Sequence, residues 1–178
     1  MKRHHLAVIV AVLFGVAGAF VYRELGNSHK PAAIEGGEVD VAAVMAATLP
    51  NLDNQPQALK QWQGKVLIVN FWAPWCPPCR EEIPGFIDLQ KKYGDKGLTF
   101  VGIALDESSR VQAFVDEVGI NYPVLIGGAE GGQLSTVAGN RLGGLPYTVV
   151  IDRQGKAVAN FTGAVAEKKL EELVAPLL

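Results

Sequence analysis

A strand pattern that runs into a Cys-Pro-Pro-Cys turn and then into a helix constrains this chain more than any other feature. Val66–Trp72 is a mostly apolar run with the length of a buried strand, and a helical pattern opens at Pro77. Cys76 and Cys79 are the only cysteines among the 178 residues. Cysteines three positions apart close too short a loop to staple a fold, so the pair indicates reactivity rather than structural support.

Strand and helix patterns alternate along the rest of the chain. Besides Pro77–Tyr93, the periodicity predicts helices over residues 109–118, 131–139 and 167–178. Strands are predicted over Val66–Trp72 and over residues 98–105, 122–126, 147–152 and 157–161, the last two joined by a hairpin turn at residues 153–156. Helices between strands imply βαβ units, so we expect an α/β fold with a sheet that is parallel at its centre and closed by an antiparallel hairpin at one edge.

Capping signals set the expected ends of these helices. Ser109 and Gln112 form the pattern of a capping box, while Gly94 and Gly119 are expected to end the first and second helices. The residues expected to face the core are Ile83, Phe86 and Ile87 in the first helix, Val111, Phe114, Val115 and Val118 in the second, and Leu170, Leu173, Val174 and Leu177 in the last.

The segment ahead of the Cys-Pro-Pro-Cys turn has weaker patterns. Residues 44–49 are predicted as a strand, residues 53–56 as a turn, and residues 58–62 as one helical turn.

The N-terminal residues have the composition of a membrane-targeting element. Residues 6–22 are uncharged and mostly apolar, and Lys2 and Arg3 precede them, which favours a cytoplasmic N-terminus. We expect an anchor over residues 1–23, a linker over 24–40 and a globular domain over 41–178. A cleaved signal peptide is the alternative, because Ala-Gly-Ala at residues 17–19 is an acceptable cleavage site. Both place the domain outside the cytoplasm, where disulfide chemistry operates.

Charge and histidine usage narrow the function. From Glu38 onward, 12 Lys and Arg stand against 16 Asp and Glu, so the domain has no basic surplus that would attract nucleic acid. The three histidines, at positions 4, 5 and 29, all precede the domain. This composition excludes Cys-His nucleophilic dyads and Cys/His zinc fingers.

The two cysteines are expected to differ in reactivity. Cys76 falls where the strand ends and the helix begins, a position that favours a thiolate, whereas Cys79 points toward the first buried turn. Pro77 suits the first helical position, and Pro78 removes a backbone donor that would otherwise stabilise the thiolate. The pair is therefore expected to reduce or exchange disulfides rather than to act as a strong oxidant. A zinc site would need carboxylates as its remaining ligands, because the domain has no further Cys and no His, and a haem attachment motif would need His where Arg80 stands.

The sequence of residues 72–79, Trp-Ala-Pro-Trp-Cys-Pro-Pro-Cys, resembles the thioredoxin family. Pro84 corresponds to the proline inside that family's active-site helix, and Leu145-Pro146, followed by a strand, looks like its cis-proline element. The anchor, residues 49–65 and residues 144–152 are similar to the membrane-tethered TlpA/ResA/CcmG group of thiol-disulfide oxidoreductases. The resemblance covers about residues 40 to 178 and implies a thioredoxin-like fold, a central mixed sheet flanked by helices.

This resemblance also implies roles for individual residues. Cys76 would attack and Cys79 would resolve, while Trp75, Pro77, Leu145 and Pro146 would contact the substrate chain. No cofactor or metal is expected.

Glu82 matches the acid that the tethered group carries on its active-site helix, and Asn70 stands where cytoplasmic thioredoxins have a buried Asp. Glu82 lies one helical turn beyond Cys79 and would accept its proton. The alternative is a helix-end carboxylate like Glu81, favoured only by the helix dipole.

The expected function is reduction or exchange of disulfides in client proteins, with the domain held at a bacterial inner membrane and facing the periplasm. By resemblance, a DsbD/CcdA-type membrane reductase would supply electrons, and apocytochrome c would be a client through cytochrome c maturation. Two alternatives stay open: a peroxidase of the peroxiredoxin class, whose Pro-x-x-x-Thr-x-x-Cys loop is not matched before Cys76, and a non-enzymatic tethered module that binds a partner or a metal.

Overall fold

The computed structural model describes residues 37–178 of the chain. The described residues all belong to one compact unit. The expected anchor over residues 1–23 and most of the linker over 24–40 lie outside the described part. Within that part, every helix is too short or too polar to cross a membrane.

A five-stranded mixed sheet forms the centre of the domain, with strand order β5-β4-β3-β6-β7. The strands are β3 (Val66–Trp72), β4 (Leu98–Ala104), β5 (Val124–Ile126), β6 (Tyr147–Ile151) and β7 (Ala157–Thr162). The strands β5, β4 and β3 run parallel to one another. Strand β6 is antiparallel to β3, and β7 is antiparallel to β6. The predicted α/β architecture, with a parallel centre and an edge hairpin, is confirmed.

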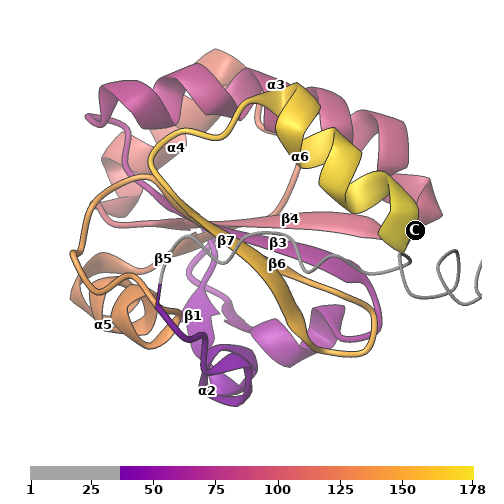
Figure 1. The fold of residues 1–178 in the computed structure, drawn as a ribbon. Coiled ribbons are helices and arrows are strands. Elements are labelled where there is room, and N and C mark those ends of the chain that lie inside the picture. Colours follow the sequence, from indigo (N-terminus) through magenta and orange to yellow (C-terminus); the bar gives the residue numbers. More distant parts are fainter. Residues whose placement is uncertain (1–36) are drawn as a thin grey trace, which may run out of the picture. The chain divides into compact units, whose positions relative to one another are not determined.

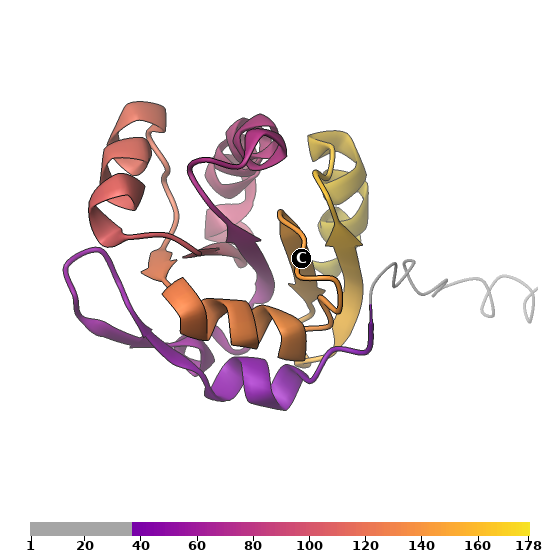
Figure 2. The ribbon, with the colours of Figure 1, turned by 90° about the vertical axis from the view of Figure 1, so that its left-hand side faces the viewer.

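Helices cover both faces of this sheet (Figures 1 and 2). The helices α3 (Pro77–Tyr93), α4 (Ser108–Val118) and α6 (Glu167–Val174) lie on one face, and α2 (Val41–Ala46) and α5 (Gly128–Val137) lie on the other. We call these the α3 face and the α5 face. The 3-10 turns are η1 (Leu59–Trp62), η2 (Gly94–Lys96) and η3 (Ala175–Leu177).

The central strand β3 supplies side chains to both faces in turn. Successive strand residues point to opposite sides, so Ile68 and Trp72 enter the core of the α3 face, whereas Val69 and Phe71 enter that of the α5 face. All seven residues of β3 are buried, which matches the near-continuous apolar run in the sequence. Asn70 shares the parity of Ile68 and Trp72 and therefore faces α3.

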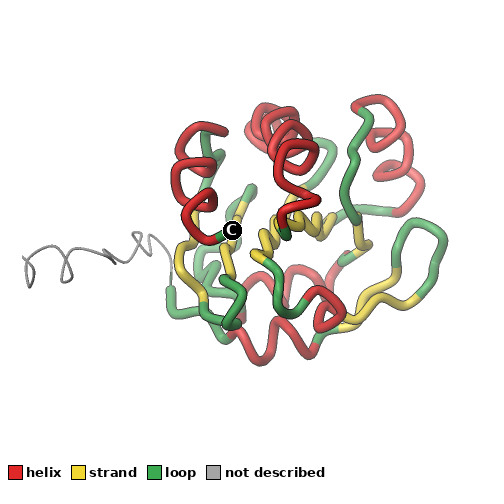
Figure 3. The backbone as a smooth tube through the Cα atoms, turned by 90° about the vertical axis from the view of Figure 1, so that its right-hand side faces the viewer, coloured by secondary structure: helices red, strands yellow, loops and turns green. Residues whose placement is uncertain are grey.

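The segment before β3 differs from its predicted structure. Residues 44–49 were expected as one strand, but Val41–Ala46 form α2, with Asp40 accepting a hydrogen bond from the Ala43 amide, and only Thr48–Pro50 form the strand β1. The N-cap bond at Asp40 starts a helix that the short apolar run does not reveal. Strand β1 pairs with β2 (Pro56–Ala58) across a turn that confirms the one predicted at residues 53–56 (Figure 3).

The predicted helix α3 is confirmed from Pro77 to Tyr93, but the start of α4 is not as expected. Helix α4 begins at Ser108, so Ser109 lies inside it and caps nothing. The Asp106 carboxylate instead accepts hydrogen bonds from the Glu107 amide and the Arg110 guanidinium, and the Gln112 side chain donates to Asp116. The capping-box prediction is therefore wrong, while the end of α4 at Gly119, with φ 74°, is confirmed.

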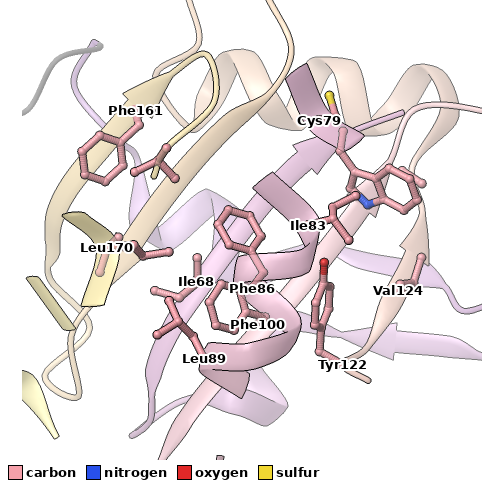
Figure 4. Close-up of a cluster of buried hydrophobic side chains, with 14 of the residues drawn as sticks. Ile68, Cys79, Ile83, Phe86, Leu89, Phe100, Tyr122, Val124, Phe161 and Leu170 are labelled. Carbon is pink, nitrogen blue, oxygen red and sulfur yellow. The ribbon is translucent and has the colours of Figure 1, made fainter. Parts of the chain in front are cut away.

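Aromatic rings fill the space between α3 and the sheet. Phe86 stacks on Phe100 at 4.9 Å, and Phe100 packs against Tyr122 at 5.5 Å between ring centroids (Figure 4). Gly102 lies on β4 against this layer, and a Cβ there would stand 2.8 Å from the Trp72 Nε1 atom. The glycine thus lets the Trp72 indole lie directly on the sheet, behind the Cys-Pro-Pro-Cys turn.

Candidate active site

Cys76 caps the N-terminus of α3, as the sequence predicted. Its Sγ accepts a hydrogen bond from the Cys79 amide at 3.4 Å, and its own amide donates to the Ala73 carbonyl at 3.1 Å. Pro77 and Pro78 follow as the first helical residues, where a missing N–H breaks no intrahelical bond. A sulfur at this end of a helix meets the positive end of the helix dipole, which favours the thiolate.

Cys76 and Cys79 are joined by a disulfide, with an S–S distance of 2.11 Å. Cys79 is completely buried and belongs to the core of the α3 face together with Ile83 and Phe86. Cys76 is 3% exposed, and its neighbour Trp75 is 65% exposed. The structure thus gives the two sulfurs unequal access, with only Cys76 bordering an open surface.

That surface is a groove of about 400 Å³ along the disulfide. It is lined by Trp75, Cys76, Pro77, Pro78, Leu105, Gly143 and Leu145. None of these side chains carries a charge, so the groove offers apolar contact beside the reactive sulfur. Leu105 and Gly143 had no predicted role. Only the fold brings the C-terminal end of β4 and the loop before β6 close to the Cys-Pro-Pro-Cys turn.

The loop before β6 forms the second wall of the groove. Its Leu145-Pro146 peptide bond is cis, and the Pro146 carbonyl accepts a hydrogen bond from the Gly163 amide. Leu145 lines the groove, whereas Pro146 itself is buried. The buried Asn140 side chain donates to the Gly144 carbonyl at 2.8 Å and so fixes the path of this loop. Asn140 Nδ2 also donates to the Ser135 hydroxyl of α5 at 2.8 Å. Sequence reasoning had not identified Asn140, because both contacts depend on the three-dimensional path of the loop.

Glu82 lies on the buried side of α3, while Glu81 beside it is exposed. Its Oε1 accepts a hydrogen bond from Asn70 Nδ2 at 2.8 Å, and its Oε2 accepts one from the Val165 amide at 3.0 Å. Burial raises the pKa of Glu82 to about 7, although the hydrogen bonds from Val165 and Asn70 act in the opposite direction. A carboxyl group with this pKa exchanges its proton readily near neutral pH.

Asn70 joins Glu82 to the sheet. Its Nδ2 group donates to Glu82 and also to the Thr148 hydroxyl at 3.0 Å, and Thr148 pairs with Asn70 across β3 and β6. The contributions of Thr148 and of the Val165 amide were not foreseen, since they lie 78 and 83 residues away from their partners in the sequence. Asn70 itself was recognised only as a departure from an aspartate.

Three more polar atoms near this cluster are buried. Trp72 Nε1, Tyr122 OH and Asn70 Oδ1 have no hydrogen-bond partner within residues 37–178. Burial, followed by the charge of Glu82, raises the pKa of Tyr122 well above its usual value, so its hydroxyl stays protonated. Figure 4 shows that hydroxyl among the apolar side chains beneath α3.

Arg80 fastens the turn from outside. Its guanidinium donates to the Pro74 carbonyl at 3.3 Å and lies 4.7 Å from the centre of the Phe114 ring on α4. As for metals, the His, Cys, Asp and Glu side chains of the described range form no group of three that could hold an ion.

A disulfide at the start of a helix, one sulfur bordering an apolar groove and a thioredoxin-like sheet behind it define the class: the protein is a thiol-disulfide oxidoreductase. Comparison with known proteins agrees. The chain belongs to the Redoxin family, whose model matches residues 38–175.

Two curated relatives match nearly the whole chain. A protein named thiol-disulfide oxidoreductase ResA from Bacillus cereus is 30% identical over 176 residues, covering 97% of this chain and 96% of that one. A thioredoxin-like protein YneN from Bacillus subtilis is 28% identical over 175 residues, covering 97% and 96% of the two chains.

Among solved structures, a secreted Mycobacterium tuberculosis disulfide oxidoreductase homologous to E. coli DsbE superposes with a TM-score of 0.64 at 28% identity. That match covers 75% of this chain and 98% of that one. A thiol:disulfide interchange protein from Chlorobium tepidum superposes with a TM-score of 0.66 at 29% identity, covering 82% and 99%. The membership predicted from the Cys-Pro-Pro-Cys segment is confirmed.

Proposed function

We propose that this oxidoreductase reduces or exchanges disulfides of client proteins outside the cytoplasm, with Cys76 attacking and Cys79 resolving. The observation that carries the proposal is the unequal placement of the two sulfurs. Cys76 borders the groove and accepts a backbone N–H, whereas Cys79 is buried one turn deeper above Glu82. A client sulfur in the groove meets Cys76 first.

In the first step, the Cys76 thiolate of the reduced protein attacks one sulfur of a client disulfide. A Cys76–client disulfide forms, the client S–S bond breaks, and the client's other cysteine leaves as a thiolate. Trp75, Pro77 and Leu145 flank the client chain along the groove, and Pro146 shapes the wall from which Leu145 projects.

In the second step, Cys79 displaces the client. Glu82 takes the Cys79 proton, and the new thiolate attacks the Cys76 sulfur, which releases the client's first cysteine as a thiolate and closes the Cys76–Cys79 disulfide. Two electrons have then passed to the client. No cofactor takes part in either step.

The finer assignment concerns location and partners. The apolar residues 6–22 would act as an anchor or signal peptide and place the domain in the periplasm of a bacterial inner membrane. A DsbD/CcdA-type membrane reductase would restore the dithiol, and apocytochrome c, whose haem attachment needs free cysteines, would be one client. The oxidoreductase class of the relatives supports this assignment.

Trapping tests the proposal. Cys79→Ala in the full chain leaves the second step without a nucleophile, so a client should stay bound to Cys76 as a disulfide that dithiothreitol releases. A trapped Cys-x-x-Cys-His apocytochrome would support cytochrome maturation, and a broad set of clients would support general reduction. If Cys79→Ala traps no protein while its Cys76 still reacts with iodoacetamide, the proposed reductase function is wrong.

A further inference from the structure

The cluster beneath the disulfide draws on four separate segments. Glu82 comes from α3, Asn70 from β3, Thr148 from β6, and the Val165 amide from the connection between β7 and α6. Asn70, Glu82 and Thr148 are all 5% exposed or less. Their hydrogen bonds are therefore shielded from competing solvent, and each fixes the orientation of the next side chain.

The Asn70 amide is suited to one task in this cluster. Its Nδ2 group has two hydrogens, and both are directed to acceptors, Glu82 Oε1 at 2.8 Å and Thr148 Oγ1 at 3.0 Å. Its oxygen has no partner within the described part of the chain, so the donor side alone sets how the amide is turned. A neutral double donor of this size is Asn. An Asp in this place would put a second carboxylate against Glu82, and the two could not both be ionised.

We propose that Asn70 is a positioning residue that acts through Glu82: anchored by Thr148, it holds the Glu82 carboxylate in the orientation and charge state that accept the Cys79 proton. The inference rests on the proposed two-step cycle. It places Asn70 in the closing step alone, because Cys76 receives its own hydrogen bond from the Cys79 backbone rather than from this cluster.

The groups that face Glu82 make its titration simple to follow. Cys79 lies one turn before it on α3, Asn70 and Thr148 on the sheet are neutral, and Val165 contributes only its amide. Tyr122, from the segment before β5, interacts with Glu82 electrostatically and stays protonated. Glu81 is exposed to solvent. Loss of the Asn70 donor removes support for the ionised form of Glu82, so the closing step should need a higher pH.

Ellman's reagent separates the two steps in the full chain. The reduced protein releases one thionitrobenzoate when Cys76 attacks and a second when Cys79 closes the disulfide, and both phases are followed by absorbance between pH 5.5 and 9. In Asn70→Ala, we expect the pH midpoint of the second phase to rise by about one pH unit, the scale of a lost hydrogen bond to a charged group. At pH 7 this slows closure about fivefold, while the first phase changes less than about twofold.

Companion variants decide between positioning and general damage. Thr148→Val removes the anchor of Asn70 and should shift the same midpoint in the same direction by a smaller amount. Thr99→Val, at a buried threonine of β4 outside the cluster, should leave both phases unchanged. Asn70→Asp places two carboxylates together and should raise the midpoint at least as far as Asn70→Ala.

Some outcomes would overturn the inference. A folded Asn70→Ala protein that keeps the parent's second-phase midpoint, or that slows both phases equally, shows that Asn70 has only a structural role. Should Asn70→Ala not fold, an unchanged midpoint in Thr148→Val leads to the same conclusion. If instead the parent itself shows no second phase, the proposed cycle has failed, which is a different result from a parent with two phases and an insensitive Asn70→Ala.

Discussion

The two faces of the sheet are built from the same strands, but they differ in the polar groups that they bury. On the α5 face the core is apolar, and its buried Tyr147 hydroxyl donates to the Ala138 carbonyl at 2.9 Å. The α3 face contains the disulfide, a buried carboxyl group and the Tyr122 hydroxyl, which has no partner among the described residues. Within the described residues, three of the buried side-chain atoms without a hydrogen-bond partner, on Asn70, Trp72 and Tyr122, lie on the α3 face beneath the disulfide, and the other two belong to Asp106 and Asn140.

The alternation of β3 makes this separation possible. Asn70 reaches the α3 face from the same strand whose Val69 and Phe71 complete the apolar α5 face. Because neighbouring residues of a strand point to opposite sides, a polar residue on one face leaves the packing of the other undisturbed. The α5 face therefore serves as a stable backing against which the reactive face is positioned.

Removal of the resolving thiol should give the largest difference between the faces. Cys79→Ala lacks the thiol that closes the disulfide, so turnover, measured as release of the second thionitrobenzoate by the reduced protein with no other thiol added, should fall at least about 1000-fold. The matched change on the α5 face, Leu125→Ala, should lower the free energy of unfolding by about 2–5 kcal/mol but leave turnover per folded molecule within about twofold. Equal losses of turnover in both variants would contradict the division between the faces.

Glu82→Gln should have the next largest effect. A buried general base contributes about 100-fold to a proton-transfer step, so closure of the disulfide should slow by about that factor while alkylation of Cys76 stays nearly unchanged. Glu81→Gln, one residue away and exposed, is the control and should change closure by less than about twofold. Unchanged closure in Glu82→Gln would make Glu82 an ordinary helix-end carboxylate.

The stability of the oxidised protein should fall between pH 5 and pH 8. The pKa of Glu82 is raised from 4.5 to about 7 in the folded state, so between these values the folded protein holds a proton on Glu82 that the unfolded chain has lost. This contribution to the free energy of unfolding is lost as pH rises through about 7. The loss should be about 2–3 kcal/mol by urea unfolding. Residues 37–178 contain no histidine, and disulfide cysteines do not titrate, so few other groups contribute in this window.

Glu82→Gln provides the control for this pH dependence. In that variant the decline in unfolding free energy between pH 5 and pH 8 should disappear. If the decline persists in Glu82→Gln at full size, another group causes it, and the pKa assigned to Glu82 is wrong.

The smallest effect compares the two buried tyrosines. Tyr147→Phe removes a satisfied hydrogen bond and strands the Ala138 carbonyl, so unfolding free energy should fall by about 1 kcal/mol or more. Tyr122→Phe removes a hydroxyl that has no partner within residues 37–178 and should be neutral or slightly stabilising. Thermal unfolding of the two single variants measures the difference, and a larger loss in Tyr122→Phe would reverse the comparison.

Sequence reasoning succeeded where a pattern is local. The seven buried residues of β3 and the seventeen-residue helix α3 follow from composition, proline placement and spacing over adjacent residues. The same locality put Cys76 at a helix N-terminus and Glu82 on the buried face beyond Cys79. The i, i+3 relation is a property of any helix and needs no knowledge of the rest of the fold.

Sequence reasoning failed where the contact that decides the structure is distant in the chain, or where a short apolar run suits both a helix and a strand. Residues 44–46 are helical because Asp40 caps them, although their apolar character suits a strand equally well. Ser109 does not cap α4, because the helix begins one residue earlier and Asp106 bonds to the Glu107 amide and to Arg110 at its start. The Thr148 and Val165 contacts to the active-site cluster depend on β6 and β7 returning to β3, which no local pattern encodes.

Proline at both positions between the cysteines limits how the redox character of the turn can be altered. Only proline lacks a backbone N–H, and both intervening positions, Pro77 and Pro78, already hold proline. The one donor seen on the Cys76 sulfur within residues 37–178 belongs to Cys79, a position that must stay cysteine. Every substitution of Pro77 or Pro78 therefore adds a potential donor to the Cys76 sulfur, and none removes one. Among Cys-x-x-Cys turns, this one has the fewest backbone N–H donors that its two middle positions allow, so substitution there can only increase their number.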